Sequence, residues 1–449
     1  MARKRNRAAG RSLFGPIFLI ALGTFMLLAM MHVVRWPSLG QWFARYWPAI
    51  LIAWGVIRLL EYFIARQQDR PAPRFGGGAV FLVVLIVLLG AAATSAHRNI
   101  DWSGMDDEFE VHGPFGEMIN GEPHEFDIRK DAPLTGNDFS FDADRADVTV
   151  LPSSDSQVHV QAHLTVYAHS EQDAENTKNK FSLDLSGSKL TATRLNDVHA
   201  AYDIQVPPNA TVEVTNTRGD VTVRDRKTAV TINTQKSDVT AENIGGNLTV
   251  HSDNRSNVAA HGVDGDVIAQ GRFDDLTATD VTGALSLDGD FFGDMHLQKI
   301  GKGVRFHSSR TDLELAKVEG EMEMSSGDLH ATSIQGPVRL VTRSKNVNLE
   351  RVSGDVDLEN QNANVEIEPA SPVGNVRVQN ARGEITFTAP SNANFVLEAR
   401  SDHGQINSDL NIPVNNSEHG SSTVNATIGK GGNRVVLTAD RGTISLHQD

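Results

Sequence analysis

Three histidines lie close together in the sequence, at His159, His163 and His169. Imidazole nitrogens are common ligands of Zn²⁺ and other transition metals, so a metal site is the first chemistry to consider. His159 and His163 belong to the alternating segment Val158 to Leu164, which is typical of a strand, and both would lie on one face of it. Residues four apart on a strand are separated by about 13 Å. That distance is too long for both side chains to bind one ion, so we predict no metal site.

Aspartate follows glycine at several turns, as in Gly219-Asp220, Gly265-Asp266 and Gly354-Asp355. Calcium-binding β-rolls also combine these residue types, but they need a Gly-Gly-x-Gly-x-Asp nonapeptide, and these turns lack the paired glycines. The segment Gly429-Lys430-Gly431-Gly432 lacks the Gly-Lys-Ser/Thr ending and the following helix of a phosphate-binding loop. We interpret the Gly-Asp pairs as polar turns and predict no cofactor.

Polysaccharide cleavage is the enzymatic chemistry best suited to a repetitive β protein. It needs carboxylates and a base that converge on one groove, whereas the acidic residues here are spread around every repeat. Sugars stack on aromatic rings, yet Trp102 is the only tryptophan outside residues 36–54. The chain has no cysteine, which excludes a thiol nucleophile. We predict no catalytic residues and no enzyme, and a polysaccharide-active β-helix is the least favoured alternative.

The elements that position these residues are short repeats between residues 219 and 387. Each repeat is a turn followed by an apolar-x-apolar strand, as in Gly219-Asp220-Val221-Thr222-Val223 and Gly354-Asp355-Val356-Asp357-Leu358. Most repeats are 16–20 residues apart, with weaker copies about nine residues along. Such fixed-period similarity is typical of solenoids, in which short strands bury their apolar face by stacking. Half units of about nine residues are too short to contain a crossover helix, which excludes a doubly wound sheet.

We therefore predict an all-β, extracytoplasmic parallel β-solenoid with about two short strands per coil of 16–20 residues. An antiparallel β-sandwich is the alternative, although it would not require uniform spacing. Alternation predicts four inward side chains, and the residues between them should be exposed. The inward set is Val221, Val223, Leu287 and Val356, and the outward set is Thr222, Ser286 and Asp357.

Two segments depart from the nine-residue spacing, residues 139–215 and 390–449, and we expect them to cap the two ends of the solenoid. Within the first of them, Ser170 to Lys180 is polar and rich in helix formers, which predicts one short surface helix.

Charge divides the chain into two parts. Residues 1–100 contain 12 Lys or Arg and two acidic residues, whereas residues 101–449 contain 29 basic and 54 acidic residues. Nucleic acid is an unsuitable partner for the acidic part, because binding phosphates requires clustered Lys and Arg.

The basic part holds three apolar segments long enough to cross a bilayer, at about residues 13–34, 48–64 and 79–96. Basic residues cluster before the first segment and between the second and third, so the positive-inside rule places the N-terminus in the cytoplasm. Three transmembrane helices then put residues 101–449 outside the cytoplasm. Residues 101–138 would be a tether with the first strands, and residues 139–449 the solenoid. Cleavage near Ala96 would release the same part, and remains an alternative.

Two segments carry a resemblance to a known family, Gly15-Pro16-Ile17-Phe18-Leu19-Ile20-Ala21-Leu22-Gly23 and Trp47-Pro48-Ala49-Ile50-Leu51-Ile52-Ala53-Trp54-Gly55. They resemble the transmembrane region of LiaI/LiaF-type bacterial envelope proteins over roughly residues 12–64. The resemblance implies that the membrane is a bacterial inner membrane. It also implies one possible role, modulation of a sensor kinase in envelope-stress signalling.

A second resemblance begins at Ile204-Gln205-Val206-Pro207, which leads through a strand to Gly219-Asp220-Val221-Thr222-Val223. It continues in Arg434-Val435-Val436-Leu437-Thr438 and Arg441-Gly442-Thr443-Ile444-Ser445-Leu446. These segments are similar to a bacterial adhesin-type domain of unknown function with a β-solenoid fold, over roughly residues 139–449. The resemblance implies no catalytic residues. We expect a membrane-anchored, non-catalytic envelope protein whose partner is another envelope protein or a surface polymer.

Overall fold

The computed structural model describes residues 122–195, 198–417 and 420–449, and these residues are nearly all β. Their single helix is α5 (Glu171–Lys178). Their strands, in chain order, are β1 (Glu122–Pro133), β2 (Asp138–Pro152), β3 (Gln157–Ala168), β4 (Leu183–Ser186), β5 (Lys189–Ala192), β6 (Val198–Val206), β7 (Thr211–Arg218), β8 (Val221–Arg226), β9 (Val230–Lys236), β10 (Val239–Ile244), β11 (Leu248–Val263), β12 (Val267–Val281), β13 (Leu285–Phe291), β14 (Met295–Ile300), β15 (Val304–His307), β16 (Thr311–Leu315), β17 (Lys317–Met324), β18 (Asp328–Gln335), β19 (Val338–Thr342), β20 (Asn346–Asn360), β21 (Val365–Arg382), β22 (Ile385–Ala389), β23 (Phe395–Ser401), β24 (Ile406–Ser408), β25 (Asn415–Asn416), β26 (Ser422–Ile428), β27 (Asn433–Arg441) and β28 (Ile444–Gln448).

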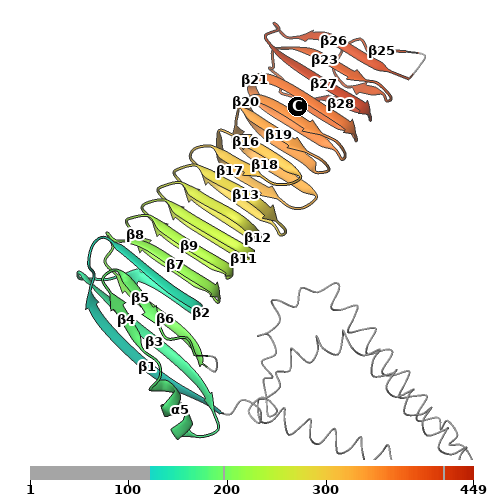
Figure 1. Cartoon of the computed structure of the whole chain (residues 1–449). Helices are drawn as coiled ribbons and strands as arrows, with labels where there is room; N and C mark the ends of the chain where they lie inside the picture. Colours follow the sequence, from blue (N-terminus) through green and yellow to red (C-terminus); the bar gives the residue numbers. More distant parts are fainter. Residues whose placement is uncertain (1–121, 196–197, 418–419) are drawn as a thin grey trace, which may run out of the picture. The chain divides into compact units, whose positions relative to one another are not determined.

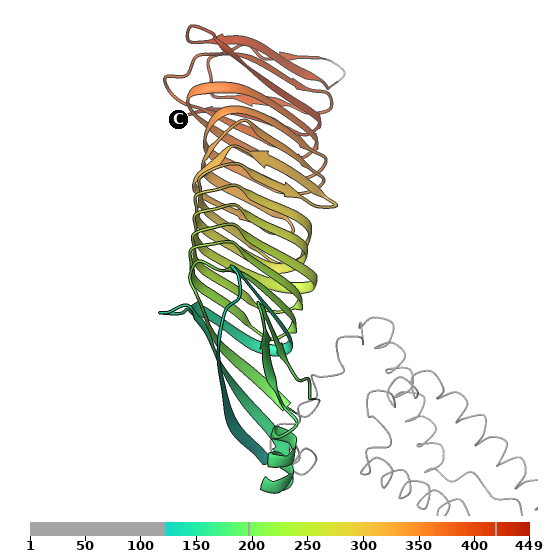
Figure 2. The same ribbon diagram turned by 60° about the vertical axis from the view of Figure 1, so that its left-hand side comes forward.

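The strands lie side by side in a stack, with β1 to β6 at one end and β23 to β28 at the other (Figures 1 and 2). Two ladders of parallel pairs run through the stack. In ladder A, Val230 of β9 lies between Val212 of β7 and Leu248 of β11. In ladder B, Val239 of β10 lies between Val221 of β8 and a valine of β11. Long strands such as β11 take part in both ladders, so all the described strands form one hydrogen-bonded sheet.

The core lies between the ladders and consists of aliphatic side chains from alternate strand positions. The four side chains predicted to point inward are at most 2% exposed, which confirms that prediction for Val221, Val223, Leu287 and Val356. The three intervening residues, Thr222, Ser286 and Asp357, are half-buried rather than exposed. Each of them has a residue in register on both neighbouring strands, and these neighbours cover its flanks.

The predicted fold class, a parallel β-solenoid preceded by a three-helix transmembrane region, is wrong. The described residues form a mixed sheet with one short helix. Four antiparallel pairings interrupt the ladders in the middle of the stack, β14 with β17, β17 with β18, β15 with β16, and β16 with β19. Further antiparallel pairs occur towards the two ends, including β1 with β3, β3 with β6, and β23 with β26.

Two tight turns reverse the strand direction in the middle of the stack and so produce these antiparallel pairings. Residues 308–310 join β15 to β16, where the Ser308 Oγ accepts a hydrogen bond from the Thr311 backbone N–H at 3.2 Å. Residues 325–327 join β17 to β18, where the Ser325 Oγ accepts from the Asp328 backbone N–H at 3.1 Å. Turns this short connect only antiparallel strands. Apolar-x-apolar spacing is the same in both strand directions, so the repeat pattern did not reveal the reversal.

The predicted short helix is confirmed as α5. Its N-cap Ser170 accepts a hydrogen bond from the Asp173 backbone N–H, which satisfies one of the free donors of the first turn. Ala174 is fully buried and packs with Val166 and Ala168 of β3, so α5 covers apolar side chains at the end of the stack formed by β1 to β6 (Figure 1).

The three predicted transmembrane helices, at about residues 13–34, 48–64 and 79–96, and residues 101–121 of the tether lie outside the described residues. Among residues 122–195, 198–417 and 420–449, no helix has the length and apolar character needed to cross a membrane. The domain boundaries, with capping segments 139–215 and 390–449, stay a prediction.

Candidate functional site

A group of paired histidines and aspartates lies on the outer side of β1, β3, β6 and β2. We call this surface the histidine face. It consists of His159, His163, His199, Asp127, Asp131, Asp147, Asp155 and Asp203. All of these side chains are at least partly exposed.

The sequence of β3 explains why the histidines face outward. Val158, Val160, Ala162, Leu164 and every second residue after them are buried, so the residues between them point to solvent. Antiparallel pairing with β1 then places Asp131 opposite His159 and Asp127 opposite His163. Directly opposed residues of neighbouring strands are close enough for side-chain contact.

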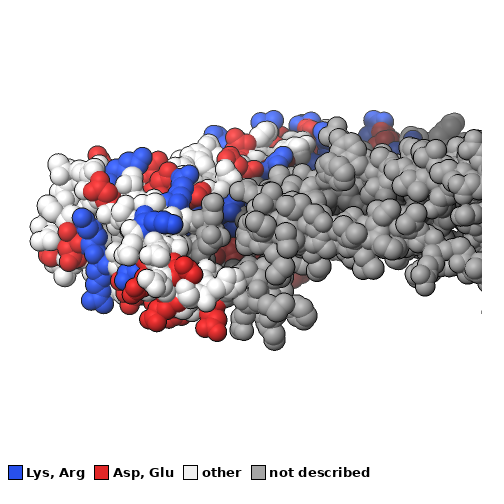
Figure 3. All heavy atoms as spheres, turned by 60° about the horizontal axis from the view of Figure 1, so that its bottom comes forward, with Lys and Arg blue, Asp and Glu red and all other residues white. Residues whose placement is uncertain are grey.

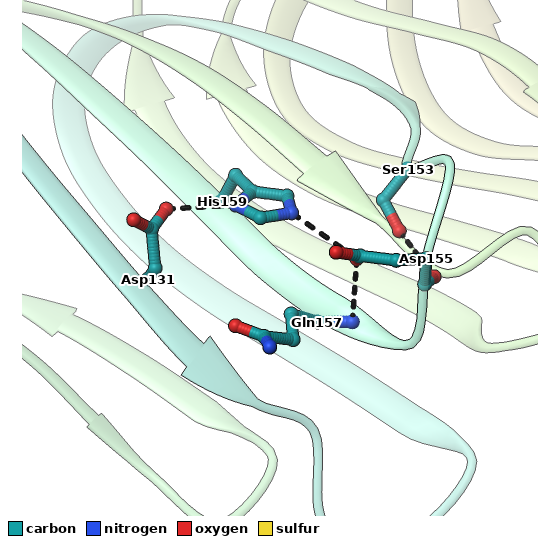
Figure 4. Close-up of polar contacts among 5 residues, drawn as sticks. All are labelled: Asp131, Ser153, Asp155, Gln157 and His159. Atoms are coloured by element: carbon teal, nitrogen blue, oxygen red, sulfur yellow. Dashed lines mark hydrogen bonds and ion pairs between the residues drawn. The ribbon is translucent and has the colours of Figure 1, made fainter.

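His159 lies between two carboxylates (Figure 4). Its Nδ1 is 2.7 Å from the Asp131 Oδ1, and its Nε2 is 3.1 Å from the Asp155 Oδ1. Hydrogen bonds to Asp131 and Asp155 favour the imidazolium form, so the pKa of His159 is raised above its usual value. The backbone N–H of Gln157 donates to Asp155 at 2.8 Å and, together with His159, lowers the pKa of that carboxyl.

His163, four residues along β3 on the same face, has the same arrangement. Its Nδ1 is 2.6 Å from the Asp127 Oδ1, and its Nε2 is 3.4 Å from the Asp203 Oδ2 of β6. His199 of β6 lies 3.6 Å from Asp147 of β2. Both nitrogens of His159 and of His163 thus face different carboxylates, so the two rings connect neighbouring strands.

A metal ion would need several ligands converging on one point. Within the part of the chain that the structure describes, no group of three or more His, Cys, Asp or Glu side chains is arranged to hold one. His169, the third histidine considered from the sequence, lies beyond the end of β3 and is exposed.

Asp and Asn side chains form a second ordered arrangement, at the turns before the repeat strands. The Asn247 Oδ1 accepts a hydrogen bond from the Asp266 backbone N–H at 3.0 Å, and the Asp266 Oδ1 accepts from the Ala284 backbone N–H at 2.8 Å. The same relation continues at other turns. A Cβ at Gly283 would lie 2.3 Å from the Gly265 carbonyl oxygen, so only glycine fits there. These contacts confirm the interpretation of the Gly-Asp pairs as polar turns.

A buried arginine was missed by the sequence reasoning. Arg226 is 1% exposed and donates hydrogen bonds to the carbonyl oxygens of Val206, Pro207 and Ala210 at 2.7, 2.5 and 2.9 Å. Burial lowers the pKa of its guanidinium to about 10. The side chain joins the end of β8 to the segment between β6 and β7, which is a structural role. The sequence held one signal for this buried arginine. It is a basic residue at the end of a strand whose other inward-facing residues are valines.

Two shallow depressions lie on the outer surface of the stack. The first has a volume of about 440 Å³ and is lined by Ser252, Asp253, Gly271, Arg272, Asp288, Gly289, Asp290, His307, Ser308 and Ser309. The second has a volume of about 390 Å³ and is lined by Pro337, Val338, Arg339, Asp355, Val356, Asp357, Asn375, Val376, Arg377, Arg434 and Val436. Figure 3 shows acidic and basic side chains interspersed over the visible surface rather than gathered by sign.

The fold and its outer surface can now be compared with known families. The family described as Toastrack DUF4097 matches residues 137–447. The chain belongs to the Toastrack DUF4097 family. The LiaF transmembrane domain matches residues 14–103, which precede the Toastrack domain. Both resemblances stated from the sequence are therefore confirmed, and the protein is a membrane-associated envelope protein.

Two solved structures are similar to this chain. A candidate cell adhesion protein from Clostridium sporogenes is 10% identical with a TM-score of 0.17, and the match covers 73% of this chain and 100% of the other. A candidate adhesin from Bacteroides fragilis is 11% identical with a TM-score of 0.23, and the match covers 72% of this chain and 97% of the other. No curated protein matches the chain.

Proposed function

We propose that this Toastrack protein is a membrane-anchored, non-catalytic component of the bacterial envelope that presents its β stack outside the cytoplasm to bind an envelope protein or a surface polymer. The match to the LiaF transmembrane domain supports the anchoring. The distribution of basic residues in residues 1–100 supports a cytoplasmic N-terminus.

The observation that carries the binding role is a regular row of charged side chains along ladder A. Arg305, Glu314, Arg339, Asp357 and Arg377 lie in register on five consecutive strands. Neighbouring strands are about 4.8 Å apart, so the charges alternate in sign at that interval. An extended partner whose own charged groups alternate in sign at the same interval would be complementary to this row.

Site-specific photocrosslinking in intact cells tests the binding role. A photoreactive residue at Arg339 or Arg377 should give one discrete adduct with a partner. The matched control places the same residue at Thr222 or Thr277, which face outward on ladder B and should give none. Equal labelling from both ladders, or none from either, would contradict the assignment of this row.

Reporter fusions test the topology. A reporter active only outside the cytoplasm should be active when fused at Gly104 and inactive at Gln68. Activity at Gln68 would overturn the three-span arrangement.

Absence of catalysis is tested by substitution. Changing any one Asp, Glu or His between residues 219 and 387 should leave function within a few-fold, provided the thermal melt is unchanged. One charge-neutral substitution that abolishes function without altering stability would instead indicate a catalytic or essential binding residue.

The match to the LiaF transmembrane domain also favours a second role, modulation of an envelope-stress sensor kinase. Deletion of the gene should then change the basal output of a stress-responsive promoter. A change restored by the full chain, and not by residues 1–103 alone, would assign that role to the Toastrack domain together with its anchor.

A further inference from the structure

Strand β1 is attached to the stack less firmly than its neighbours. Among the described strands it pairs with β3 alone, so its other edge has no strand beside it. None of its side chains is fully buried, whereas every second residue of β3 is. Its inward residues Phe126 and Ile128 are only partly buried against the core. The outward contacts of β1 therefore matter more than those of an inner strand.

Two of these outward contacts are ion pairs with histidines. Asp131 lies 2.7 Å from His159, and Asp127 lies 2.6 Å from His163, each pair directly opposed across β1 and β3. An imidazolium ring donates through both nitrogens, whereas a neutral ring has one N–H and no charge. Each protonated histidine can therefore hold the carboxylate of β1 and a second carboxylate at the same time.

The charged groups around these two histidines are mostly acidic. They come from β1, the turn after β2, β6 and β2, and they are Glu125, Asp127, Arg129, Asp131, Asp155, His199, Asp203, Arg145 and Asp147. Six of these nine groups are carboxylates, so the charge around the two rings is mainly negative.

We propose that β1 is a pH-dependent latch, held on β3 by the imidazolium form of His159 and loosened when this ring loses its proton. The raised pKa of His159 agrees in sign, because its stabilisation is present at acidic pH and is lost as the pH rises through the folded-state value. Residues 1–121, which include the LiaF-like segment, are continuous with β1. With the proposed topology, on which this point rests, the latch gives the connection between anchor and Toastrack domain a sensitivity to the acidity outside the cytoplasm. It does not depend on which partner the stack binds.

Hydrogen exchange of the full chain in lipid nanodiscs tests the latch. The measured quantity is the protection factor of peptides covering β1, corrected for the intrinsic pH dependence of exchange. It is measured at about pH 5.5 and about pH 8, which lie below and above the usual pKa range of imidazole. We expect β1 to lose about two- to fivefold in protection at the higher pH, the size of one partly exposed ion pair. Peptides covering β8 to β12 should change little.

Two variants make the test specific. The double variant His159→Gln and His163→Gln should show low protection of β1 at both pH values, with no pH dependence. The control His296→Gln changes a histidine that lies 3.5 Å from Glu323 between β14 and β17, and it should keep the wild-type response of β1. Protection of β1 that is unchanged by pH in the wild type, or a pH response that survives in the double variant, would overturn the proposal.

Discussion

The histidine face and the middle of the stack hold neighbouring strands together by different means. Between β8 and β13, valines, leucines and alanines from adjacent strands are in register and almost fully buried, and Asn or Asp side chains bond each turn to the next. At the histidine face, β1 relies on partly exposed ion pairs. Apolar burial does not titrate, whereas imidazole does. One sheet thus combines a centre held by apolar burial with an edge held by side chains that can titrate.

The largest expected effect comes from placing a charge in the core of the stack. Val356 is 2% exposed and lies in register between Val338 and Val376. Val356→Asp should therefore cost about 3–5 kcal/mol and unfold several neighbouring strands, because an unpaired carboxylate would be buried. Thermal melts of the full chain in detergent measure the loss.

The control for this prediction is the next residue along the strand. Asp357 faces outward and lies 3.4 Å from Arg377 in a half-exposed pair, so Asp357→Val should change stability by less than about 1 kcal/mol. Equal destabilisation by the two variants, or the reverse order, would contradict the inward and outward assignment.

The second effect concerns the buried guanidinium. Arg226→Met should lower the free energy of unfolding by about 2–4 kcal/mol, because two buried and one partly buried carbonyl oxygens lose a charged donor. Arg224→Met is the matched control, since Arg224 makes an exposed pair with Glu242 at 2.9 Å. Chemical denaturation of both variants should separate them clearly. Similar losses would show that the buried hydrogen bonds contribute little.

The third prediction concerns the hydrogen bonds that join successive turns. Asp266→Ala removes the acceptor of the Ala284 backbone N–H and should cost about 1 kcal/mol, the usual value of one hydrogen bond. Asp266→Asn keeps an acceptor oxygen and should recover most of the loss. If Asp266→Asn were as damaging as Asp266→Ala, the charge rather than the hydrogen bond would matter at this turn.

The smallest effect concerns pH. Because the pKa of His159 is raised in the folded protein, its contribution is fully present below the unfolded value of about 6.5 and disappears as the pH rises through the folded value. His159→Gln should remove less than about 1 kcal/mol at acidic pH and almost nothing at alkaline pH. An NMR titration of the imidazole protons should also show that Asp131→Asn lowers the pKa of His159. An unchanged titration in that variant would rule out Asp131 as the cause.

Local patterns predicted which residues enter the core. Val221 and Leu287 follow apolar-x-apolar spacing after a turn, and burial at such positions is set by strand geometry that operates over two residues. Strand direction was not predictable in this way. Strand direction depends on whether a turn such as residues 308–310 folds the chain back beside the strand that precedes it. The apolar pattern of the next strand is the same whether it runs parallel or antiparallel.

The histidine face was only partly predictable. Alternation placed His159 and His163 on one side of a strand, which is correct. Their partners Asp131 and Asp127 lie 28 and 36 residues away in sequence, on a strand whose register is set by tertiary pairing. Arg226 was missed for a similar reason, because its acceptors are backbone carbonyl oxygens, which leave no trace in the sequence.

The reversal in the middle of the stack has a consequence for how the chain folds. Parallel neighbours from β8 to β13 are mostly 18 or 19 residues apart, whereas the turn at residues 325–327 brings Met324 beside Leu329, only five residues later. Closing a short loop costs less chain entropy than closing a long one, and local contacts form faster. We expect β17 and β18 to form the nucleus of folding. Ladder growth would then proceed from the middle of the Toastrack domain towards both ends.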